Sequence, residues 1–215
     1  MEPVVRPARE SDVPFLSWVQ QEAARSHLPK GFWDLSFPGA DEDRLRIMGR
    51  ICKSPVRSFC HWSGFLVAEV DGNAVAGLSG YTNASVATGP ALFEALDHAL
   101  DEEKWSAEQR EAMGGRIAPF LTCIPEAADD SWVIEWVATR PEYRGKGLIS
   151  TLLHAILDLG RERGHKLMQI GVLIGNTPAQ RAYESVGFKV VDEKSHPDFE
   201  RAIGCPGIRR LLRPA

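Results

Sequence analysis

The sequence predicts an α/β (α+β) fold in which a mixed, mostly antiparallel central sheet is flanked by helices. Stretches rich in β-branched and aromatic residues alternate with stretches that carry apolar residues at helical spacing. An Asp-Gly turn at residues 71–72 separates two of the strand-like stretches, which is typical of a hairpin. A basic glycine turn at residues 144–147 joins a strand to a helix. Strands with helices between them give this class of fold.

The composition limits both the size of the fold and the classes of partner. A chain of 215 residues can bury one good core, so we expect a single domain over residues 1–215. The net charge of -4 gives no support for nucleic-acid binding, which needs a basic face. No apolar run approaches the roughly 20 residues of a membrane span, and we expect no signal region. The four cysteines form no Cys-x-x-Cys pair, so we expect reduced thiols, no metal site and a cytoplasmic location.

The N-terminal part is predicted to contain a strand, two helices and an intervening loop. A short strand is expected at Val4–Arg6, and Ser11 is the predicted N-cap of the helix that follows. Residues 27–40 contain two prolines and two glycines, which predicts a loop. This loop carries too much apolar surface to leave in water, so it either packs over the core or lines a cleft. Residues 41–53 are predicted to be helical and to end before Pro55.

A hairpin and a long insertion come next. The two strands of the hairpin are predicted at residues 65–70 and 74–81. A helical insertion of about residues 84–130 then precedes the central strand, with helices predicted at 90–100 and 106–113. We expect Gly114 and Gly115 to end the second helix. Two roles are open for the insertion, a cap over a functional site or the surface of a homodimer.

The C-terminal half is predicted to alternate between strand and helix. Its elements are, in order, a strand at 132–139, a helix from 148 to Gly164, a strand at 167–174, a helix capped by Thr177 and ended by Gly187, a strand at 188–191, a loop or short helix at 195–206, and a strand at 208–212.

The turn at residues 144–147 has a composition with a chemical use. The first turn of a helix has N–H groups without partners and carries the positive end of the helix dipole. Gly145 and Gly147 let a phosphate approach the backbone, and Arg144 and Lys146 add formal positive charge. The turn is therefore typical of a diphosphate cradle. The alternative is that the glycines only shape a strand-to-helix turn while the cations stay solvated.

The segment Arg144–Ile149 resembles a signature of the GNAT N-acetyltransferase superfamily, which is arginine or glutamine, two spacers, glycine, one spacer, and glycine or alanine. In that family this turn binds the pyrophosphate of acetyl-CoA. Arg144 and Gly147 match the signature, whereas Ile149 departs from it because the last position is usually small. A phosphate-loop kinase is excluded, since no lysine-serine or lysine-threonine pair follows the glycines.

A second segment is similar to the family's asparagine, two spacers, alanine, three spacers, tyrosine, three spacers, glycine-phenylalanine motif. The matching residues are Asn176, Ala179, Tyr183, Gly187 and Phe188. The resemblance covers nearly the whole chain and is strongest over residues 133–188. It implies a GNAT-type fold with the helical insertion before the central strand. It also implies an N-acetyltransferase that moves an acetyl group from acetyl-CoA to a primary amine of a small molecule or peptide, by direct attack in a ternary complex.

The resemblance also implies which residues bind acetyl-CoA. In the family the central strand splays from its neighbour and offers backbone groups to the pantetheine arm, and Asn176 contacts that arm. An alternative for Asn176 is a loop residue that tolerates a tight turn. The residues implied for acetyl-CoA are Val137, Ala138, Thr139, Arg144, Gly145, Lys146, Gly147, Leu148, Ile149, Ser150, Asn176 and Ala179.

Acetyl transfer needs a neutral amine, a stabilised carbonyl oxygen and a protonated leaving sulfur. A thiol ionises near pH ~8.5 and a phenol near ~10, so a tyrosine can supply the proton. By resemblance Tyr183 is that general acid, with a packed aromatic residue as the alternative, and Val137 supplies the oxyanion N–H. Glu135 is the candidate base, because it is a carboxylate in an otherwise apolar strand. Strand alternation predicts that Glu135 shares a face with Val137 and Thr139. A salt bridge, or removal of the amine proton through water, remains open.

Two other functions are compatible with parts of the sequence. One is a non-catalytic CoA-binding regulatory module of the same fold, and retention of Tyr183 argues against it. The other is an unrelated α+β interaction protein that would not bind CoA. The acceptor amine is not identified by the sequence. The acidic balance permits a cationic substrate, and the Trp-rich loops favour an aromatic or hydrophobic amine, but neither feature decides.

Overall fold

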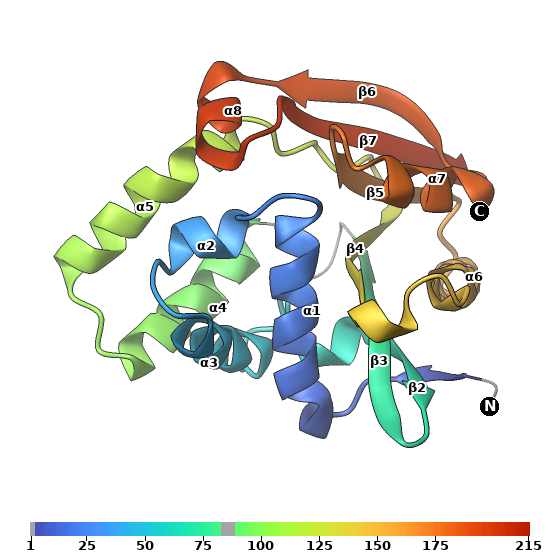
Figure 1. Cartoon of the computed structure of the whole chain (residues 1–215), viewed down its shortest axis with the longest axis horizontal. Coiled ribbons are helices and arrows are strands. Elements are labelled where there is room, and N and C mark those ends of the chain that lie inside the picture. The colour runs from blue at the N-terminus through green and yellow to red at the C-terminus, as the bar shows by residue number, and fades with distance from the viewer. Residues whose placement is uncertain (1–2, 83–88) are drawn as a thin grey trace.

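The computed structural model of the chain describes residues 3–82 and 89–215. The first residues of the expected insertion, 84–88, lie outside these residues. Within the described ranges, seven strands form one sheet in the order β1-β2-β3-β4-β5-β7-β6 (Figure 1). The strands are β1 (Val4–Pro7), β2 (Phe65–Val70), β3 (Asn73–Thr82), β4 (Ser131–Thr139), β5 (Leu167–Leu173), β6 (Lys189–Ser195) and β7 (Gly207–Pro214).

Every neighbouring pair of these strands is antiparallel except β4 and β5, which run parallel. The predicted mixed, mostly antiparallel sheet is therefore confirmed. The β2–β3 turn has φ angles of 53° at Asp71 and 79° at Gly72, as a type I′ hairpin requires. A parallel pair needs a crossover connection, and α6 supplies it between β4 and β5.

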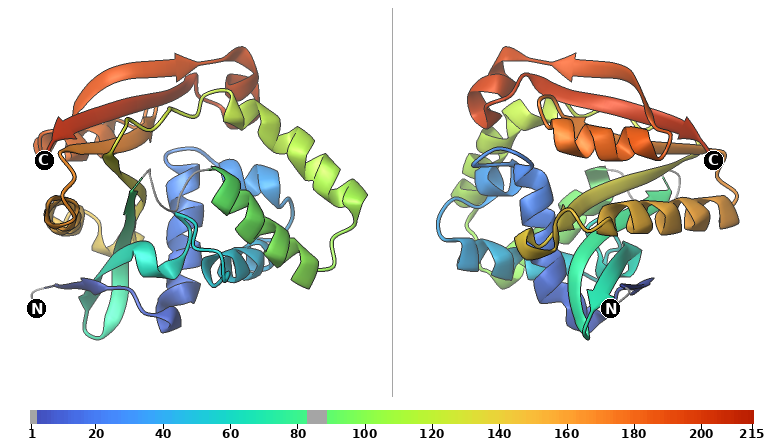
Figure 2. Two further views of the ribbon diagram at one scale, coloured as in Figure 1. Left: turned by 180° about the vertical axis from the view of Figure 1, so that it is seen from behind. Right: turned by 45° about the vertical axis from the view of Figure 1, so that its right-hand side comes forward.

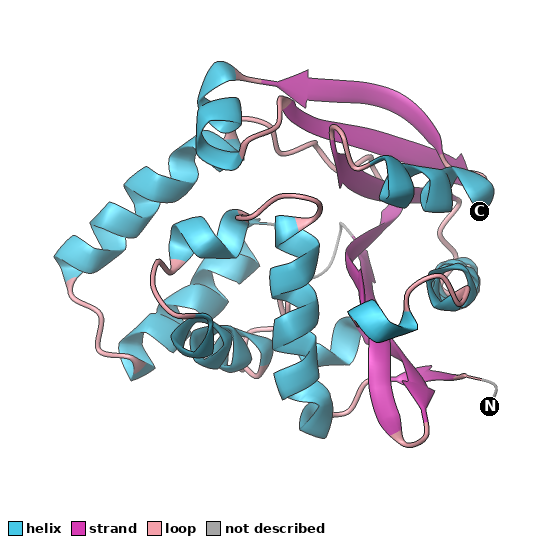
Figure 3. Cartoon of the chain, in the orientation of Figure 1, coloured by secondary structure: helices cyan, strands magenta, loops and turns pink. Residues whose placement is uncertain are grey.

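Helices cover both faces of the sheet (Figures 1 and 3). Helix α6 packs on one face against β2, β3 and β4, and α1 packs on the other face against β3 and β4. Helices α2 to α5 extend the α1 side, where α4 packs on α3 and α5 packs on α2 and α8 (Figure 2). The helices are α1 (Val13–Arg25), α2 (Phe32–Ser36), α3 (Asp41–Cys52), α4 (Gly89–Glu102), α5 (Ala107–Leu121), α6 (Leu148–Glu162), α7 (Thr177–Ser185) and α8 (Pro197–Ile203).

The contact of α6 with the sheet depends on Trp132, which is fully buried in the core between them. A Cβ atom added to Gly80 would lie 2.6 Å from Cζ2 of this indole, and one added to Gly160 would lie 2.8 Å from its Cδ1. Real Cβ atoms do not approach this closely, so both glycines make room for the ring. The helix is thereby held against β3 and β4, and this fixes the position of its N-terminus.

Four predictions about where helices begin or end were wrong, and each error has a physical reason. Ser11 lies in a 3-10 turn at residues 10–12, and α1 begins after it at Val13. The expected loop 27–40 contains α2, because burial of Phe32 and Trp33 stabilises a short helix that begins at Gly31.

Helix α5 continues through Gly114 and Gly115 to Leu121. Each glycine costs only about 1 kcal/mol in a helix, and burial of Met113 and Ile117 offsets that cost. The N-cap of α7 is Asn176 rather than Thr177, since the Asn176 side chain accepts the N–H of Ala179 at 3.1 Å.

Candidate active site

The sheet opens between its two parallel strands. The pairing of β4 with β5 runs from Ser131↔Leu167 to Ile134↔Ile170 and ends there. Strand β5 continues to Leu173 but pairs only with β7 on its other side, while β4 continues with β3 (Figure 2). Backbone groups of β4 beyond Ile134 that face β5 therefore have no partner strand. The resemblance predicts a splayed central strand, and the geometry agrees.

A bulge in β4 lies at the start of this opening. Gly77 pairs with Ala138 and Ser79 pairs with Glu135, so β4 contains one residue more than β3 between these pairs. Trp136 has a φ of 56°, which is rare for a bulky residue and costs about 1–2 kcal/mol. Bulges of this kind redirect side chains next to functional sites.

The bulge overturns the predicted alternation. Thr139 lies opposite Ala76, and both Ala76 and Val137 belong to the core under α6. Glu135 lies opposite Ser79 on the other face, the face covered by α1 and the insertion. Glu135 therefore does not share a face with Val137 and Thr139. The extra residue places the carboxylate on one side of the strand and the Val137 side chain on the other.

The turn before α6 has the geometry that a diphosphate cradle needs. Gly145 and Gly147 have φ angles of 74° and 77°, and a Cβ atom on either would meet no heavy atom within 4 Å. Residues 144–147 and Ser150 are exposed. Within the described chain, no hydrogen bond has a main-chain N–H of residues 145–150 as its donor. These amides are therefore available to an anion.

The side chains around the turn have different environments. Arg144 donates from Nε to the carbonyl oxygen of Thr139 at 3.2 Å, and Nζ of Lys146 lies 4.6 Å from the ring centre of Tyr143. Leu148 is buried and Ile149 is half-buried, and both pack into the core under α6. The larger residue at the last position of the signature therefore points into the protein and leaves the turn open.

Two of the predicted cofactor residues lie at the start of α7. Oδ1 of Asn176 accepts the N–H of Ala179, and Nδ2 of Asn176 donates to Oγ of Ser26 at 2.6 Å. Both ends of this amide are thus engaged inside the protein, and the second bond joins α7 to the C-terminus of α1. In β4, Val137 and Ala138 are half-buried, and the buried Oγ1 of Thr139 has no hydrogen-bond partner among the described residues.

The two predicted catalytic side chains are electrostatically coupled. Burial raises the pKa of Glu135 to about 7 from 4.5. Burial, and then the charge of Glu135, raise the pKa of Tyr183, which is 6% exposed in the core under α6. In the described residues, Glu135 has no ion pair or side-chain hydrogen bond. The structural alternative of a salt bridge to Glu135 is therefore not supported.

Aromatic rings that the motifs did not identify lie next to Glu135. The ring of Phe59 stacks on Tyr81 at 5.4 Å and on Trp136 at 5.8 Å between centroids, and Trp136 lies 5.8 Å from Trp33. Phe59, Tyr81 and Trp136 are half-buried. Glu135 raises the pKa of Tyr81 in addition to the effect of burial, which places the two groups near each other. The density of aromatic residues was visible in the sequence, but their convergence on Glu135 was not.

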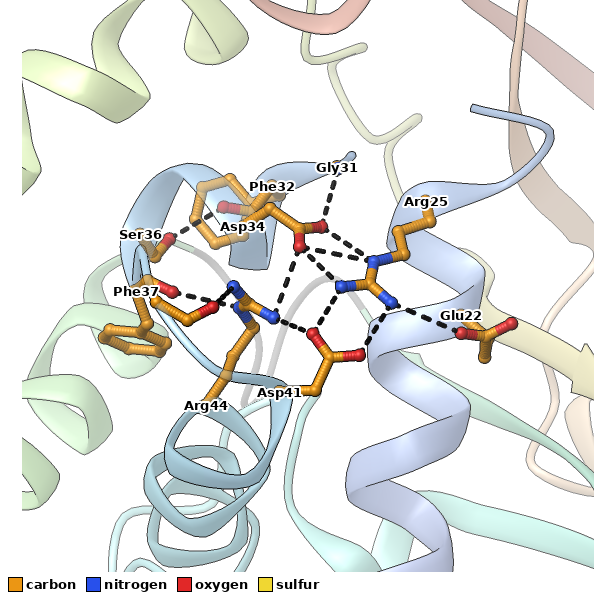
Figure 4. A network of polar contacts seen from close by, with 10 residues as sticks. Glu22, Arg25, Gly31, Phe32, Asp34, Ser36, Phe37, Asp41 and Arg44 are labelled. Atoms are coloured by element: carbon orange, nitrogen blue, oxygen red, sulfur yellow. Dashed lines mark hydrogen bonds and ion pairs between the residues drawn. The ribbon is translucent and has the colours of Figure 1, made fainter. Parts of the chain in front are cut away.

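A polar network holds the segment that carries Trp33 (Figure 4). Arg25 of α1 pairs with Asp34 and with Asp41, both at 2.7 Å. Arg44 of α3 is 4% exposed, pairs with the same two acids, and donates to the carbonyl oxygens of Phe37 and Gly39. The hydrogen bond from Arg25 is the main reason that the pKa of Asp41 falls to about 2. The network therefore ties α1, α2 and α3 together.

The described residues lack two features that are typical of other classes of protein. Across residues 3–82 and 89–215, no three His, Cys, Asp or Glu side chains gather where they could hold a metal ion. None of the helices in those ranges combines the length and the apolar content that crossing a membrane requires.

Comparison with known proteins gives a match over most of the chain. The model of the Acetyltransferase (GNAT) family matches residues 36–188. A Bacillus subtilis (strain 168) protein, provisionally named ribosomal protein bS18-alanine N-acetyltransferase, is 28% identical over 106 residues, which cover 49% of this chain and 69% of that protein. Streptothricin acetyltransferase of Streptomyces lavendulae is 34% identical over 74 residues, which cover 34% of this chain and 39% of that protein.

The fold is also found in a Salmonella typhimurium protein whose structure was solved with its cofactor acetyl-CoA and which is provisionally named an acetyltransferase. The two structures superpose with a TM-score of 0.56 at 17% identity, over 100% of this chain and 94% of the other. At this identity the likeness concerns the fold alone.

Proposed function

Because the chain belongs to the acetyltransferase (GNAT) family and is an acetyl-CoA-dependent acetyltransferase, we propose that it acetylates a primary amine by direct attack in a ternary complex. The observation that carries this proposal is the exposed start of α6, with unpaired amides, at the point where β4 and β5 separate. We place the chemistry in a single domain of residues 1–215. The four free, buried cysteines support the expected cytoplasmic location.

In this proposal acetyl-CoA enters the opening between β4 and β5. The main-chain N–H groups of residues 145–150 hold the diphosphate, helped by the charges of Arg144 and Lys146. The pantetheine arm lies along residues 137–139, whose edge toward β5 has no partner strand. Asn176 and Ala179 form the far side of the opening.

The chemical step forms a bond from the amine nitrogen to the acetyl carbon and breaks the bond from that carbon to sulfur. Glu135 accepts the proton of the amine, and a pKa of about 7 suits a base that works near neutral pH. The N–H of Val137 stabilises the developing oxyanion. Burial keeps Tyr183 protonated. Its hydroxyl gives its proton to the departing sulfur and takes up the second proton that the nitrogen loses, while Glu135 releases the first proton to solvent.

The proposal is tested by blocking the cradle while controlling for backbone strain. Gly147→Leu places a side chain where the diphosphate should lie, and Gly72→Leu creates the same positive-φ strain in the β2–β3 turn. Both variants should lose about 1 kcal/mol of stability. Only Gly147→Leu should lose the rise in melting temperature with acetyl-CoA and the acetyl-CoA-dependent release of thiol.

Two outcomes would contradict the proposal. Equal responses of the two variants to acetyl-CoA would remove residues 145–150 from the binding site. A normal thermal response of the unmodified protein to acetyl-CoA, without thiol release on any amine, would favour a non-catalytic CoA-binding module.

A further inference from the structure

Glu135 is an isolated negative charge in an apolar part of the protein. Burial is the one physical cause that shifts its pKa, and among the described residues neither a cation nor a hydrogen-bond donor faces the carboxylate. A carboxylate that the fold desolvates is normally paired or coordinated. Glu135 is half-buried on the face of β4 that α1 covers, and without a partner among the described residues it is suited to a cation that arrives with the substrate.

The surface next to this charge is aromatic. Phe59 stacks between Tyr81 and Trp136, so three half-buried rings from the loop before β2, from β3 and from β4 form one wall. Tyr81 is the diagonal neighbour of Glu135 across the β3–β4 pair, which places its ring on the same face of the sheet. Such a wall attracts an ammonium group through the ring faces and attracts an apolar body through burial.

In the described part of the chain, Glu135 is the one carboxylate among the groups that raise the pKa of Tyr81, so the wall has one negative charge beside it. Asp34, which follows Trp33, and Asp41 are both neutralised by Arg25 and Arg44. Glu103, the residue that directly follows α4, is paired with Arg46 and Arg50. A second ammonium group on the substrate would therefore lose its hydration without gaining a partner.

We propose that the acceptor is a primary monoamine with a compact apolar body, an alkylamine or arylalkylamine, whose ammonium group meets Glu135 and whose body lies against Phe59, Tyr81 and Trp136. This inference rests on the proposed acetyltransferase function and deepens it. It distinguishes the substrate from two other classes of amine. Polyamines carry a second ammonium group, and the N-termini of peptides carry an amide next to the amine.

The test uses four amines, two of which differ by one charge. Hexylamine and 1,6-diaminohexane have the same carbon chain and differ by one ammonium group. The other two amines are 2-phenylethylamine and a tetrapeptide that begins with alanine. Thiol release from acetyl-CoA is measured with each of them. We expect kcat/KM for hexylamine and 2-phenylethylamine to exceed that for the diamine and the peptide by about tenfold or more. Equal or faster turnover of the diamine or the peptide would overturn the inference and leave the proposed function intact. Absence of turnover on all four, with acetyl-CoA bound, would overturn the inference, and the proposed function would fall with it only if a wider panel of amines also released no thiol.

A variant series tests the wall itself. Phe59→Leu and Tyr81→Leu should each raise KM for hexylamine by about tenfold with little change in kcat or in KM for acetyl-CoA. Tyr81→Phe keeps the ring and should keep KM. Phe93→Leu, at a residue of α4 that is 40% exposed, is the matched control and should change neither constant. Unchanged KM in both leucine variants of the wall would show that the apolar body binds elsewhere.

Discussion

Glu135 carries a consequence for stability that can be measured without a substrate. Its pKa of about 7 in the folded protein lies above the 4.5 of an exposed glutamate, so folding favours the protonated form. The stability that protonation supplies is complete below pH 4.5 and is lost as the pH rises through about 7. Glu135→Gln, which cannot ionise, should therefore match the unmodified protein near pH 4.5 and exceed its unfolding free energy by about 3 kcal/mol at pH 8.

Urea unfolding of both proteins at the two pH values measures this difference. A constant difference across the pH range would mean that Glu135 ionises normally and is not desolvated by the fold. The same variant should lose most of its acetyl transfer at pH 8, because the glutamine cannot accept the proton of the amine. Gained stability with lost activity is the pattern expected where a catalytic group is held in an unfavourable environment.

At the scale of elements, the polar network ties α2 to α1 and α3, and α2 carries Trp33, whose ring lies 5.8 Å from that of Trp136 in the wall. Arg44 is the centre of this network, because it is buried and makes contacts with two acids and two main-chain carbonyl groups (Figure 4). Arg44→Met should cost about 2 kcal/mol or more of stability, since it leaves buried carbonyl oxygens and two carboxylates without this partner.

The matched control is Arg46→Met in the same helix. Arg46 also pairs with two acids, but its side chain is 49% exposed, and exposed pairs contribute about 0–1 kcal/mol. Thermal unfolding of the two variants compares the two sites directly. Similar losses would mean that the buried network does not fix α2, and the position of Trp33 would need another cause.

The order of strands and helices was predictable from the sequence because hydrophobic period, turns and caps are local signals. The glycine turn at residues 144–147 was also predictable, because glycines and cations at the start of a helix have a direct physical use, whereas its binding of acetyl-CoA stays a prediction. The bulge at Trp136 was not predictable from the sequence. Its positive φ depends on how β4 pairs with β3, and the pattern of residue types along β4 does not reveal it. Burial of Arg44 was missed for a similar reason, because its partners lie on other elements.

At the scale of the whole molecule, the sheet consists of two parts that share a short parallel seam. Strands β1 to β4 form one part and β5 to β7 the other, and the seam is limited to residues 131–134 of β4. Helix α6 crosses between the parts, and the hydrogen bond from Asn176 to Ser26 joins them on the α1 side. A ligand in the opening should therefore bind both parts at once and stabilise them together.

Hydrogen exchange with and without acetyl-CoA tests this arrangement. The amides of residues 145–150 have no hydrogen-bond partner among the described residues and should exchange rapidly in the free protein, so rapid-quench labelling is required. Acetyl-CoA should slow them by about tenfold or more, together with the amides of residues 137–139. At a hundredfold excess over Kd, it should also raise the unfolding free energy by about 2.7 kcal/mol.

Strand β6 supplies the internal control, because it is an edge strand with every residue exposed and lies far from the opening in the sheet order. Its free amides should exchange at the same rate in both states. Protection of residues 145–150 and 137–139 in a single concentration-dependent step would follow from one ligand that bridges the two parts of the sheet. Protection at residues 137–139 without any at 145–150 would place acetyl-CoA on β4 alone and would remove the start of α6 from its site.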